Sequence, residues 1–538
     1  MYANYSLADD QRERQDQSCL QDLWITDPRH DKISIEKRKG GLLRDSYGWI
    51  FKHVDYRKWL NNEQDQVLWI KGDPGKGKTM LLCGIIDELS ASTRLKNKSA
   101  TTLLSFFFCQ ATDSRINNAT AVLRGLIYLL IAQKRSLLSH VRKNYDDAGK
   151  ALFEDTNAWV ALCEIFTRIL QDQDPSLDST YLIIDALDEC TADLPKLLNF
   201  IAQASATAPG IKWIISSRNW PAIEEQLRGK RQKTTLCLEL NSTSVSAAVG
   251  IYIKHKSNEL AEKKDYDPEI REAVLEHLLS YANDTFLWVA LVCQNLESVM
   301  EWNVRSKLKE FPAGLDSLYL QMLTQINNSE DARLCKQILA ISLTVYRPIT
   351  LAEMSSLFQK PKGMSDNPKY LVQLIGLCGS ILTLRESTIY FVHQSAKDFL
   401  LQASDQVFLS NARRVHYNLF WRSIQVMSKT LRRNVYSLES PGVCIEQVEQ
   451  PNSDPLAIGR YACVYWGDHL MDSDVREYKI IDIKDGGLVF SFLGTTYLHW
   501  LEALSLLKRL TDGIAMIIKL ESWLKVSFST LFIGYYNR

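Results

Sequence analysis

Short apolar runs bounded by polar residues recur through the first half of the chain. Such runs predict buried strands, and we expect five of them: Val67–Ile70, Thr101–Cys109, Tyr181–Ile184, Lys212–Ser217 and Thr235–Leu240. Apolar residues at helical spacing lie between and after these runs, at Met80–Leu89, Ala119–Ala132, Asn157–Leu170, Leu194–Ala206 and Trp220–Arg228. Strands that alternate with helices predict an α/β fold, in which a parallel five-stranded core sheet is covered by helices on both faces.

A different pattern follows the fifth expected strand. From Ser244 to Leu343 the apolar spacing predicts helices only, and Asp284–Leu296 is apolar nearly all round, as in a buried helix. Thr350 and Glu353 have the spacing of a capping box, so a new helix is expected to begin there.

A helix and a hairpin are expected next. Pro368–Leu377 has helical spacing, and the short runs Ser380–Leu384 and Thr388–Val392 predict two strands joined by a tight turn. Ser395 and Asp398 are expected to cap the helix that follows. Helices followed by a hairpin predict a winged-helix domain, so we expect the whole chain to be mixed α/β and rich in helix.

These patterns divide the chain into seven parts. They are a disordered tail (1–18), a segment preceding the core (19–65), the α/β core (66–243), a helical domain (244–330), a winged-helix-like domain (331–435), a linker (436–456) and a C-terminal helical segment (457–538). The tail is expected to be disordered because it is mostly polar and has little apolar surface to bury.

The composition disfavours several classes of protein. A chain of 538 residues is too long for one hydrophobic core. Its 63 basic and 63 acidic side chains give no net charge, which argues against binding to nucleic acid or to a membrane surface. No run of uncharged apolar residues is long enough to span a bilayer. The eleven cysteines show neither zinc nor disulfide spacing, so we expect reduced thiols and a cytoplasmic protein.

The residues GDPGKGKT match the phosphate-binding loop G-x-x-x-x-G-K-[ST] in full, with a strand predicted before them and a helix after them. A glycine-rich turn that matched by chance would lack this context. Glycines allow backbone N–H groups to approach phosphates, and the helix N-terminus adds unpaired N–H groups. The expected nucleotide-binding residues are Gly72, Asp73, Pro74, Gly75, Lys76, Gly77, Lys78 and Thr79.

Two of these side chains have expected roles, and a third has none. Lys78 should reach the β- and γ-phosphates, and the Thr79 hydroxyl should hold Mg²⁺. The motif assigns nothing to the Lys76 side chain. We therefore expect it to be exposed, with only its backbone amide lining the loop.

An acidic turn follows the third expected strand. A nucleotide hydrolase needs a carboxylate for Mg²⁺ at the end of a neighbouring strand, and Asp185 has that position. Either Asp188 or Glu189 is expected to orient the water that attacks the γ-phosphate. Arg218 ends the fourth strand and would face the γ-phosphate if this strand lies between the first and the third. Taken alone, such residues would indicate only a solvated turn and a solvated strand end.

Four segments in this order resemble the NACHT-type signal-transduction NTPases of the STAND class, and in particular fungal proteins related to vegetative-incompatibility factors. They are GDPGKGKT, LIIDALDEC, KWIISSRNWPAIE and FVHQSAKDFL. The resemblance extends from about Cys19 to about Leu520, over nearly the whole chain. It implies that the α/β core is a NACHT domain, followed by helical and winged-helix domains that pack over the nucleotide.

The resemblance also implies a mechanism and a set of ligands. Such a module holds ADP or GDP in a closed state, and it opens and self-associates when ATP or GTP with Mg²⁺ takes the place of the diphosphate. His393, in FVHQSAKDFL, matches a histidine that touches the diphosphate in the closed form of related proteins. An effector domain before the core and a repeat array after it are usual in the family and are not recognisable here. Either the chain is a truncated relative, or unknown effector and sensor proteins are its partners.

Three readings of the function remain open. The first is a signalling switch that hydrolyses ATP or GTP slowly, in fungal self/non-self recognition or a similar immune response. The second is a conventional ATPase with sustained turnover, or a truncated nucleotide-binding scaffold. The third is a DNA-binding winged helix, which the sequence disfavours because its candidate recognition helix, NPKYLVQLIGLCG, has one lysine.

Overall fold

The computed structural model describes residues 2–62, 64–155, 157–172, 177–207, 210–227, 233–361, 367–378, 381–408, 411–440, 443–473 and 486–536. The chain forms two compact units, Met1–Leu318 and Tyr319–Arg538. We describe each unit by itself.

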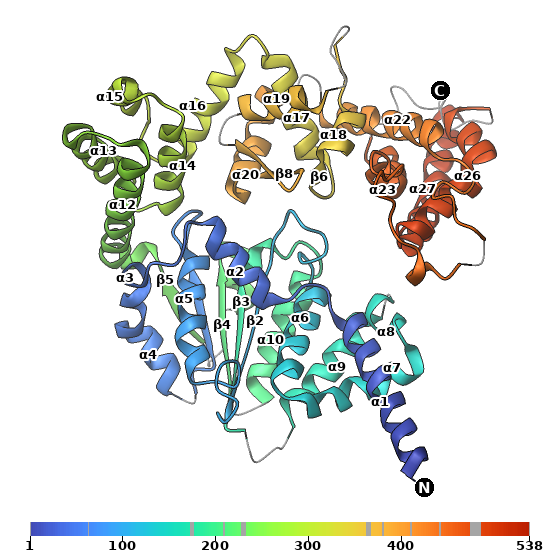
Figure 1. Cartoon of the computed structure of the whole chain (residues 1–538), viewed down its shortest axis with the longest axis horizontal. Helices are drawn as coiled ribbons and strands as arrows, with labels where there is room; N and C mark the ends of the chain where they lie inside the picture. Colours follow the sequence, from blue (N-terminus) through green and yellow to red (C-terminus); the bar gives the residue numbers. More distant parts are fainter. Residues whose placement is uncertain are drawn as a thin grey trace. The chain divides into compact units, whose positions relative to one another are not determined.

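The first unit contains a five-stranded parallel sheet (Figure 1). Its strands are β1 (Val67–Lys71), β2 (Thr102–Phe108), β3 (Ser179–Asp185), β4 (Ile211–Ser217) and β5 (Lys233–Cys237). They lie in the order β2-β3-β4-β1-β5, and every neighbouring pair is parallel. The five predicted strands and the α/β fold class are therefore confirmed. β4 lies between β1 and β3, which is the arrangement that the interpretation of Arg218 requires.

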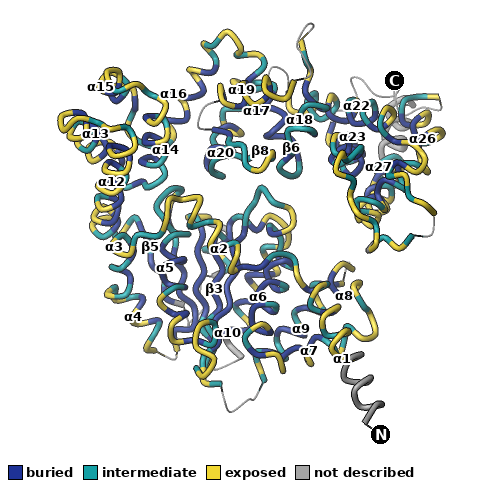
Figure 2. Tube along the Cα trace, viewed as in Figure 1, coloured by how far each residue is buried: buried dark blue, intermediate teal, exposed yellow. Residues whose placement is uncertain are grey.

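Helices on the sheet bury most of the strand residues. The helices that follow strands are α5 (Lys78–Ala91), α6 (Ala119–Gln133), α9 (Ala158–Leu170), α10 (Leu194–Thr207) and α11 (Pro221–Leu227). α5 contacts β2, β3 and β4, whereas α6 contacts β2. Figure 2 shows the strands as the largest continuous buried region of this unit. The bulky side chains of Trp69, Phe107 and Trp213 lie in its core.

The prediction of a disordered tail over residues 1–18 is wrong. Tyr2–Leu23 forms one helix, α1, which contacts α7 (Leu138–Ala148) and α6. Arg142 Nη1 of α7 lies 2.5 Å from Asp16 Oδ1, and Cys19 is fully buried. The tail composition did not reveal this helix because its partners lie more than 100 residues away in the sequence.

Short helices and then longer ones complete the first unit. Those between α1 and β1 are α2 (Pro28–Arg38), α3 (Arg44–Tyr47), η1 (Gly48–Lys52) and α4 (Val54–Asn61). Those after β5 are η4 (Glu239–Asn241), α12 (Ser242–Lys264), α13 (Pro268–Tyr281), α14 (Phe286–Glu297), η5 (Glu301–Asn303) and α15 (Val304–Leu308). The helix α16 (Leu315–Asn327) begins in the first unit and continues into the second. Within α14 the residues Trp288, Val289, Val292 and Leu296 are fully buried, as the apolar pattern of Asp284–Leu296 predicted.

The second unit begins with helices around a small antiparallel sheet. Its elements are α17 (Ala332–Thr344), β6 (Ile349–Thr350), α18 (Leu351–Leu357), α19 (Pro368–Leu377), β7 (Leu382–Arg385), β8 (Thr388–Phe391) and α20 (Gln394–Gln402). The strand order is β6-β8-β7, and this succession of helices and strands is that of a winged helix. The Thr350–Glu353 capping box is present at α18. Ser380, where the hairpin was expected to begin, lies outside the described residues.

The remaining helices of the second unit share a separate core. They are α21 (Ser404–Val407), α22 (Ala412–Thr430), η7 (Ile445–Gln447), α23 (Arg460–Asp472), α26 (Leu488–Leu506) and α27 (Leu510–Tyr536). Phe420, Trp466 and Trp500 are buried together in this core. No helix within the described parts of the chain has the length and apolar character needed to cross a bilayer.

Candidate phosphate-binding site

The loop between β1 and α5 has the backbone that phosphate binding needs. Gly75 and Gly77 have φ values of 79° and 84°, a left-handed conformation that favours glycine. Gly77 is the N-cap of α5, so the first N–H groups of that helix have no partner within it. These amides and the positive end of the helix dipole make an anion site.

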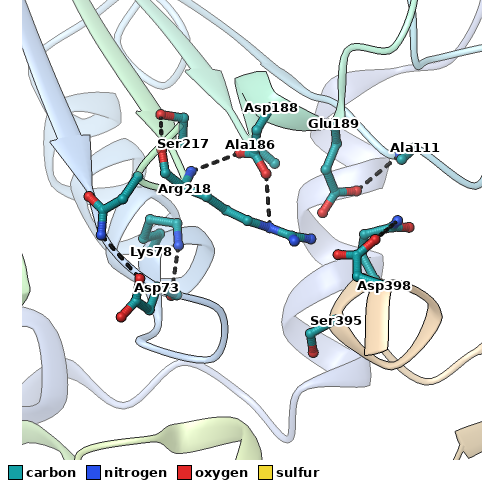
Figure 3. Close-up of polar contacts among 12 residues, drawn as sticks. Asp73, Lys78, Ala111, Ala186, Asp188, Glu189, Ser217, Arg218, Ser395 and Asp398 are labelled. Atoms are coloured by element: carbon teal, nitrogen blue, oxygen red, sulfur yellow. Dashed lines mark hydrogen bonds and ion pairs between the residues drawn. The ribbon is translucent and has the colours of Figure 1, made fainter. Parts of the chain in front are cut away.

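Lys78 is directed back at the loop. Its ammonium group donates to the carbonyl of Gly72 at 2.5 Å. It also donates to the carbonyl of Asp73 at 2.9 Å (Figure 3). Burial lowers the pKa of Lys78, while the carboxylates of Asp188 and Asp185 act in the opposite direction. Lys78 and the acidic turn thus belong to one electrostatic site. Thr79, the next residue of α5, is half-buried.

Asp185 is the last residue of β3 and is 3% exposed. The Ser216 hydroxyl, on β4, donates to Asp185 Oδ1 at 2.6 Å and accepts the main-chain N–H of Ala186 at 2.9 Å. Ser216 therefore orients the carboxylate. A carboxylate and a hydroxyl such as that of Thr79 are the oxygen ligands that Mg²⁺ takes alongside water and phosphate, so the donor set fits this ion.

Asp188 and Arg218 form a buried ion pair at the same edge of the sheet (Figure 3). Arg218 Nε lies 3.0 Å from Asp188 Oδ2, and the Arg218 main-chain N–H donates to Oδ1, also at 3.0 Å. Burial raises the pKa of Asp188, and the charges of Arg218 and Lys78 oppose that shift. Arg218, which was predicted to face the γ-phosphate, is therefore paired with Asp188. Asp188 is one of the two carboxylates predicted to orient the attacking water.

Glu189 has a different environment from Asp188. Its Oε2 accepts the main-chain N–H of Ala111 at 3.0 Å (Figure 3). Burial raises the pKa of Glu189 to about 7, against the opposing effect of the Ala111 hydrogen bond. A carboxyl group with this pKa exchanges its proton near neutral pH, as general bases do.

The expectation of an exposed Lys76 side chain is wrong. Lys76 is half-buried, and its ammonium group donates to the main-chain carbonyl of Asn283 at 2.9 Å. Asn283 lies in the turn between α13 and α14, about 200 residues along the chain. Nothing in the phosphate-loop motif indicated this contact, because the motif describes only local sequence.

Three groups of residues at the site were missed by sequence reasoning. Ser216 was predicted only as part of the strand Lys212–Ser217, and no turn was predicted at Asn283. Glu239 follows β5, and its Oε1 accepts the main-chain N–H of Asp73 at 2.6 Å. The only local signal was that Ser216 and Glu239 stand near the carboxyl ends of parallel strands, where ligands of such sheets bind.

His393 lies in the second unit, as the N-cap of α20. Its Nδ1 accepts the main-chain N–H of Ser395 at 3.1 Å. The prediction that Ser395 and Asp398 cap this helix is therefore wrong. The Ser395 hydroxyl lies 2.8 Å from His393 Nδ1 and 2.9 Å from the hydroxyl of Tyr319. The role of His393 toward a diphosphate stays a prediction.

Comparisons with known proteins agree with this geometry. A family model described as nephrocystin 3, N-terminal, matches residues 45–218, which include the loop, the acidic turn and Arg218. Vegetative incompatibility protein HET-E-1 of Podospora anserina is 54% identical over 526 residues, covering 95% of this chain. The chain spans only 38% of the length of that relative.

Three solved structures are similar at a lower level. The Walker-type ATPase PABY2304 of Pyrococcus abyssi has 12% identity and a TM-score of 0.33, covering 67% of this chain and 96% of its own. Drosophila ORC bound to DNA has 13% identity and a TM-score of 0.29, covering 72% and 92%. The Aeropyrum pernix ORC1 protein in complex with DNA has 12% identity and a TM-score of 0.30, covering 68% and 92%. Scores this low support no functional conclusion.

Proposed function

We propose that this chain is a nucleotide-dependent signalling switch. Its 54% identity to HET-E-1 makes it a relative of NACHT-type fungal vegetative-incompatibility proteins. It binds ATP or GTP together with Mg²⁺ and hydrolyses the triphosphate slowly, which resets the switch. The NACHT core is assigned to residues 66–243, and the helical and winged-helix-like domains to 244–330 and 331–435.

One observation carries this proposal. Lys78, the pair Asp185 and Asp188, and Arg218 come from three places in the sequence, yet their charges act on one another at the carboxyl edge of β1, β3 and β4. A phosphate loop alone would support binding. A loop with a buried carboxylate, a second acidic residue and an arginine within the same site supports phosphoryl transfer to water.

Each side chain has a role in the proposed reaction. Lys78 exchanges the carbonyls of Gly72 and Asp73 for oxygens of the β- and γ-phosphates. Thr79 and Asp185 would hold Mg²⁺, and the bound ion would neutralise charge on the phosphates. Of the two carboxylates, Glu189 is the better base for the attacking water, because Asp188 is already paired with Arg218. Arg218 would release Asp188 to contact a γ-phosphate, and this competition suits slow turnover.

The biological role is proposed from the relationship to HET-E-1. A switch in fungal incompatibility would remain closed on a diphosphate, with His393 as a ligand, and would self-associate after exchange for the triphosphate. Effector and sensor partners are expected and not identified. The neutral charge balance gives no support for nucleic acid as a partner.

The nucleotide that co-purifies with the protein tests the proposal most directly. We expect ADP or GDP at close to one per chain, and its base identifies the specificity. Lys78→Ala should remove the bound nucleotide, whereas Lys96→Ala, a change at an exposed lysine that pairs with Asp87 of α5, should retain it. Wild-type protein free of nucleotide, or full retention in Lys78→Ala, would contradict the proposal.

Steady-state hydrolysis separates a switch from a conventional ATPase. Turnover well above about one per second is usual for a dedicated enzyme and would favour sustained hydrolysis. A slower rate, together with a tightly held diphosphate, is the result expected of a switch.

A further inference from the structure

The turn between α13 and α14 lies against the phosphate loop. A methyl group added at Gly75 would come within 2.7 Å of Thr285 Cγ2, and one added at Gly77 within 2.9 Å of the Phe286 ring. Real Cβ atoms do not approach other heavy atoms this closely. The two left-handed glycines of the loop are therefore needed for the approach of this turn as well as for the curvature of the loop itself.

The Lys76 side chain connects the same two segments. Its ammonium group donates to the carbonyl of Asn283, and the Thr285 hydroxyl donates to that carbonyl at 3.0 Å. One carbonyl of the turn thus accepts a charged donor from the loop and a neutral donor from the turn. The charge-assisted bond is the stronger of the two.

The turn has a left-handed backbone at two consecutive residues. Asn283 and Asp284 have φ values of 45° and 55°, a conformation that costs energy outside glycine, although less for Asn and Asp than for other side chains. The Ser246 hydroxyl of α12 donates to Asp284 Oδ1 at 2.5 Å. Strain of this kind persists only where surrounding contacts hold it, and it often marks an element with a second conformation.

We propose that Lys76 is a positioning residue that couples the phosphate loop to the α13–α14 turn and so slows the release of bound nucleotide. The inference rests on the proposed nucleotide-binding function. The loop cannot move away from Thr285 and Phe286 without stretching the Lys76–Asn283 bond. A bond that holds the loop in one conformation slows any release of nucleotide that requires the loop to move. The lysine thereby transmits the state of the loop to the helical domain.

The dissociation rate of a fluorescent diphosphate, chased with excess unlabelled diphosphate, tests this inference on the full-length chain. We expect Lys76→Met to accelerate release about tenfold, the effect of losing one charge-assisted hydrogen bond. Lys76→Arg should restore most of the slow rate, because a guanidinium can still donate to the Asn283 carbonyl. A merely structural role would show as a lower unfolding temperature without this rescue.

Three further variants make the result specific. Asn283→Gly keeps the carbonyl and removes the backbone strain, so release should stay slow. Thr285→Val removes the weaker donor and should accelerate release about two- to threefold. Lys96→Met is the matched lysine control and should leave the rate as in wild type.

The outcomes distinguish the inference from the function on which it rests. If the wild type binds no nucleotide, the proposed function fails. If the wild type binds nucleotide and Lys76→Met releases it at the wild-type rate, the coupling is wrong and the function stands. If Lys76→Met does not fold, the rate of nucleotide release from Thr285→Val tests the coupling instead. A release rate equal to that of the wild type would then contradict the coupling.

Discussion

Arg218 donates to both carboxylate oxygens of Asp188, through its main-chain N–H and through Nε, each at 3.0 Å. The pair joins the end of β4 to the turn after β3. Because Asp188 is 3% exposed and Arg218 15% exposed, most water is excluded from the interaction. A γ-phosphate would have to compete with this carboxylate for the guanidinium, which links the nucleotide state to the packing of two strand ends.

Arg218→Ala should destabilise the protein strongly. Removing one partner of a buried pair leaves the other charge without compensation, at a cost of about 3 kcal/mol in unfolding free energy. Urea denaturation without added nucleotide measures this, with Arg44→Ala as the control. Arg44 is exposed and lies 3.6 Å from Glu88, so its loss should cost less than about 1 kcal/mol. Adding Asp188→Asn to Arg218→Ala should recover stability, and a strictly additive double variant would show that the pair contributes nothing.

Ser216→Ala should weaken the response to Mg²⁺. The hydroxyl orients the Asp185 carboxylate, and loss of such a supporting hydrogen bond lowers metal affinity about tenfold or more. Titration of Mg²⁺ into protein with a fluorescent triphosphate gives the half-saturating concentration. Ser90→Ala is the matched control, because this buried serine donates to Ile86 within its own helix. If Ser216→Ala needs the same Mg²⁺ concentration as the wild type, the assignment of Asp185 as a metal ligand would be contradicted.

Glu189 should make the stability of the fold depend on pH. Burial raises its pKa from 4.5 to about 7, so the folded state holds a proton that the unfolded state releases at lower pH. Its contribution is fully present below pH 4.5 and is lost as the pH rises through 7, by about 3 kcal/mol. Urea denaturation of wild type and Glu189→Gln between pH 5 and 8 measures the difference. Parallel pH profiles for the two proteins would contradict the shift.

If Glu189 is the base, its protonation should also change the rate of triphosphate hydrolysis with pH. The carboxylate is the active form, so the rate of the wild type should rise with pH and level off above about pH 7. Glu189→Gln should lose both the rate and the inflection. A normal rate in Glu189→Gln would transfer the water-orienting role to Asp188.

Replacing either of two helical glycines with alanine should change the stability of the fold, in opposite directions at the two positions. A methyl group at Gly125 of α6 would overlap the ring of Phe107, which is buried on β2, whereas Gly250 of α12 has open space around it. Gly125→Ala should cost about 1–3 kcal/mol through overpacking. Gly250→Ala should gain about 0.5–1 kcal/mol, because alanine favours a helix over glycine. Thermal unfolding of both variants tests the packing of the sheet, and a stabilised Gly125→Ala would contradict it.

The sequence by itself determined the elements whose signals are local. The five strands, the helix after the glycine loop and the capping box at Thr350 were all predicted, since each depends on periodicity or spacing within a few residues. The positions of the glycine loop, Asp185 and Arg218 at or after strand ends followed from the same runs. These residues could be assigned to one site because parallel strands end at a common edge.

Only the tertiary structure decided which residues meet across long separations. Three relationships depend on long separations: the placement of β4 between β1 and β3, the hydrogen bond from Ser216 to Asp185, and the contact from Lys76 to Asn283. The two hydrogen bonds join residues 31 and 207 positions apart. The helix at residues 2–23 also depends on a distant partner, α7. Local hydrophobic patterns carry no information about these pairings, because packing selects among surfaces that look alike in sequence.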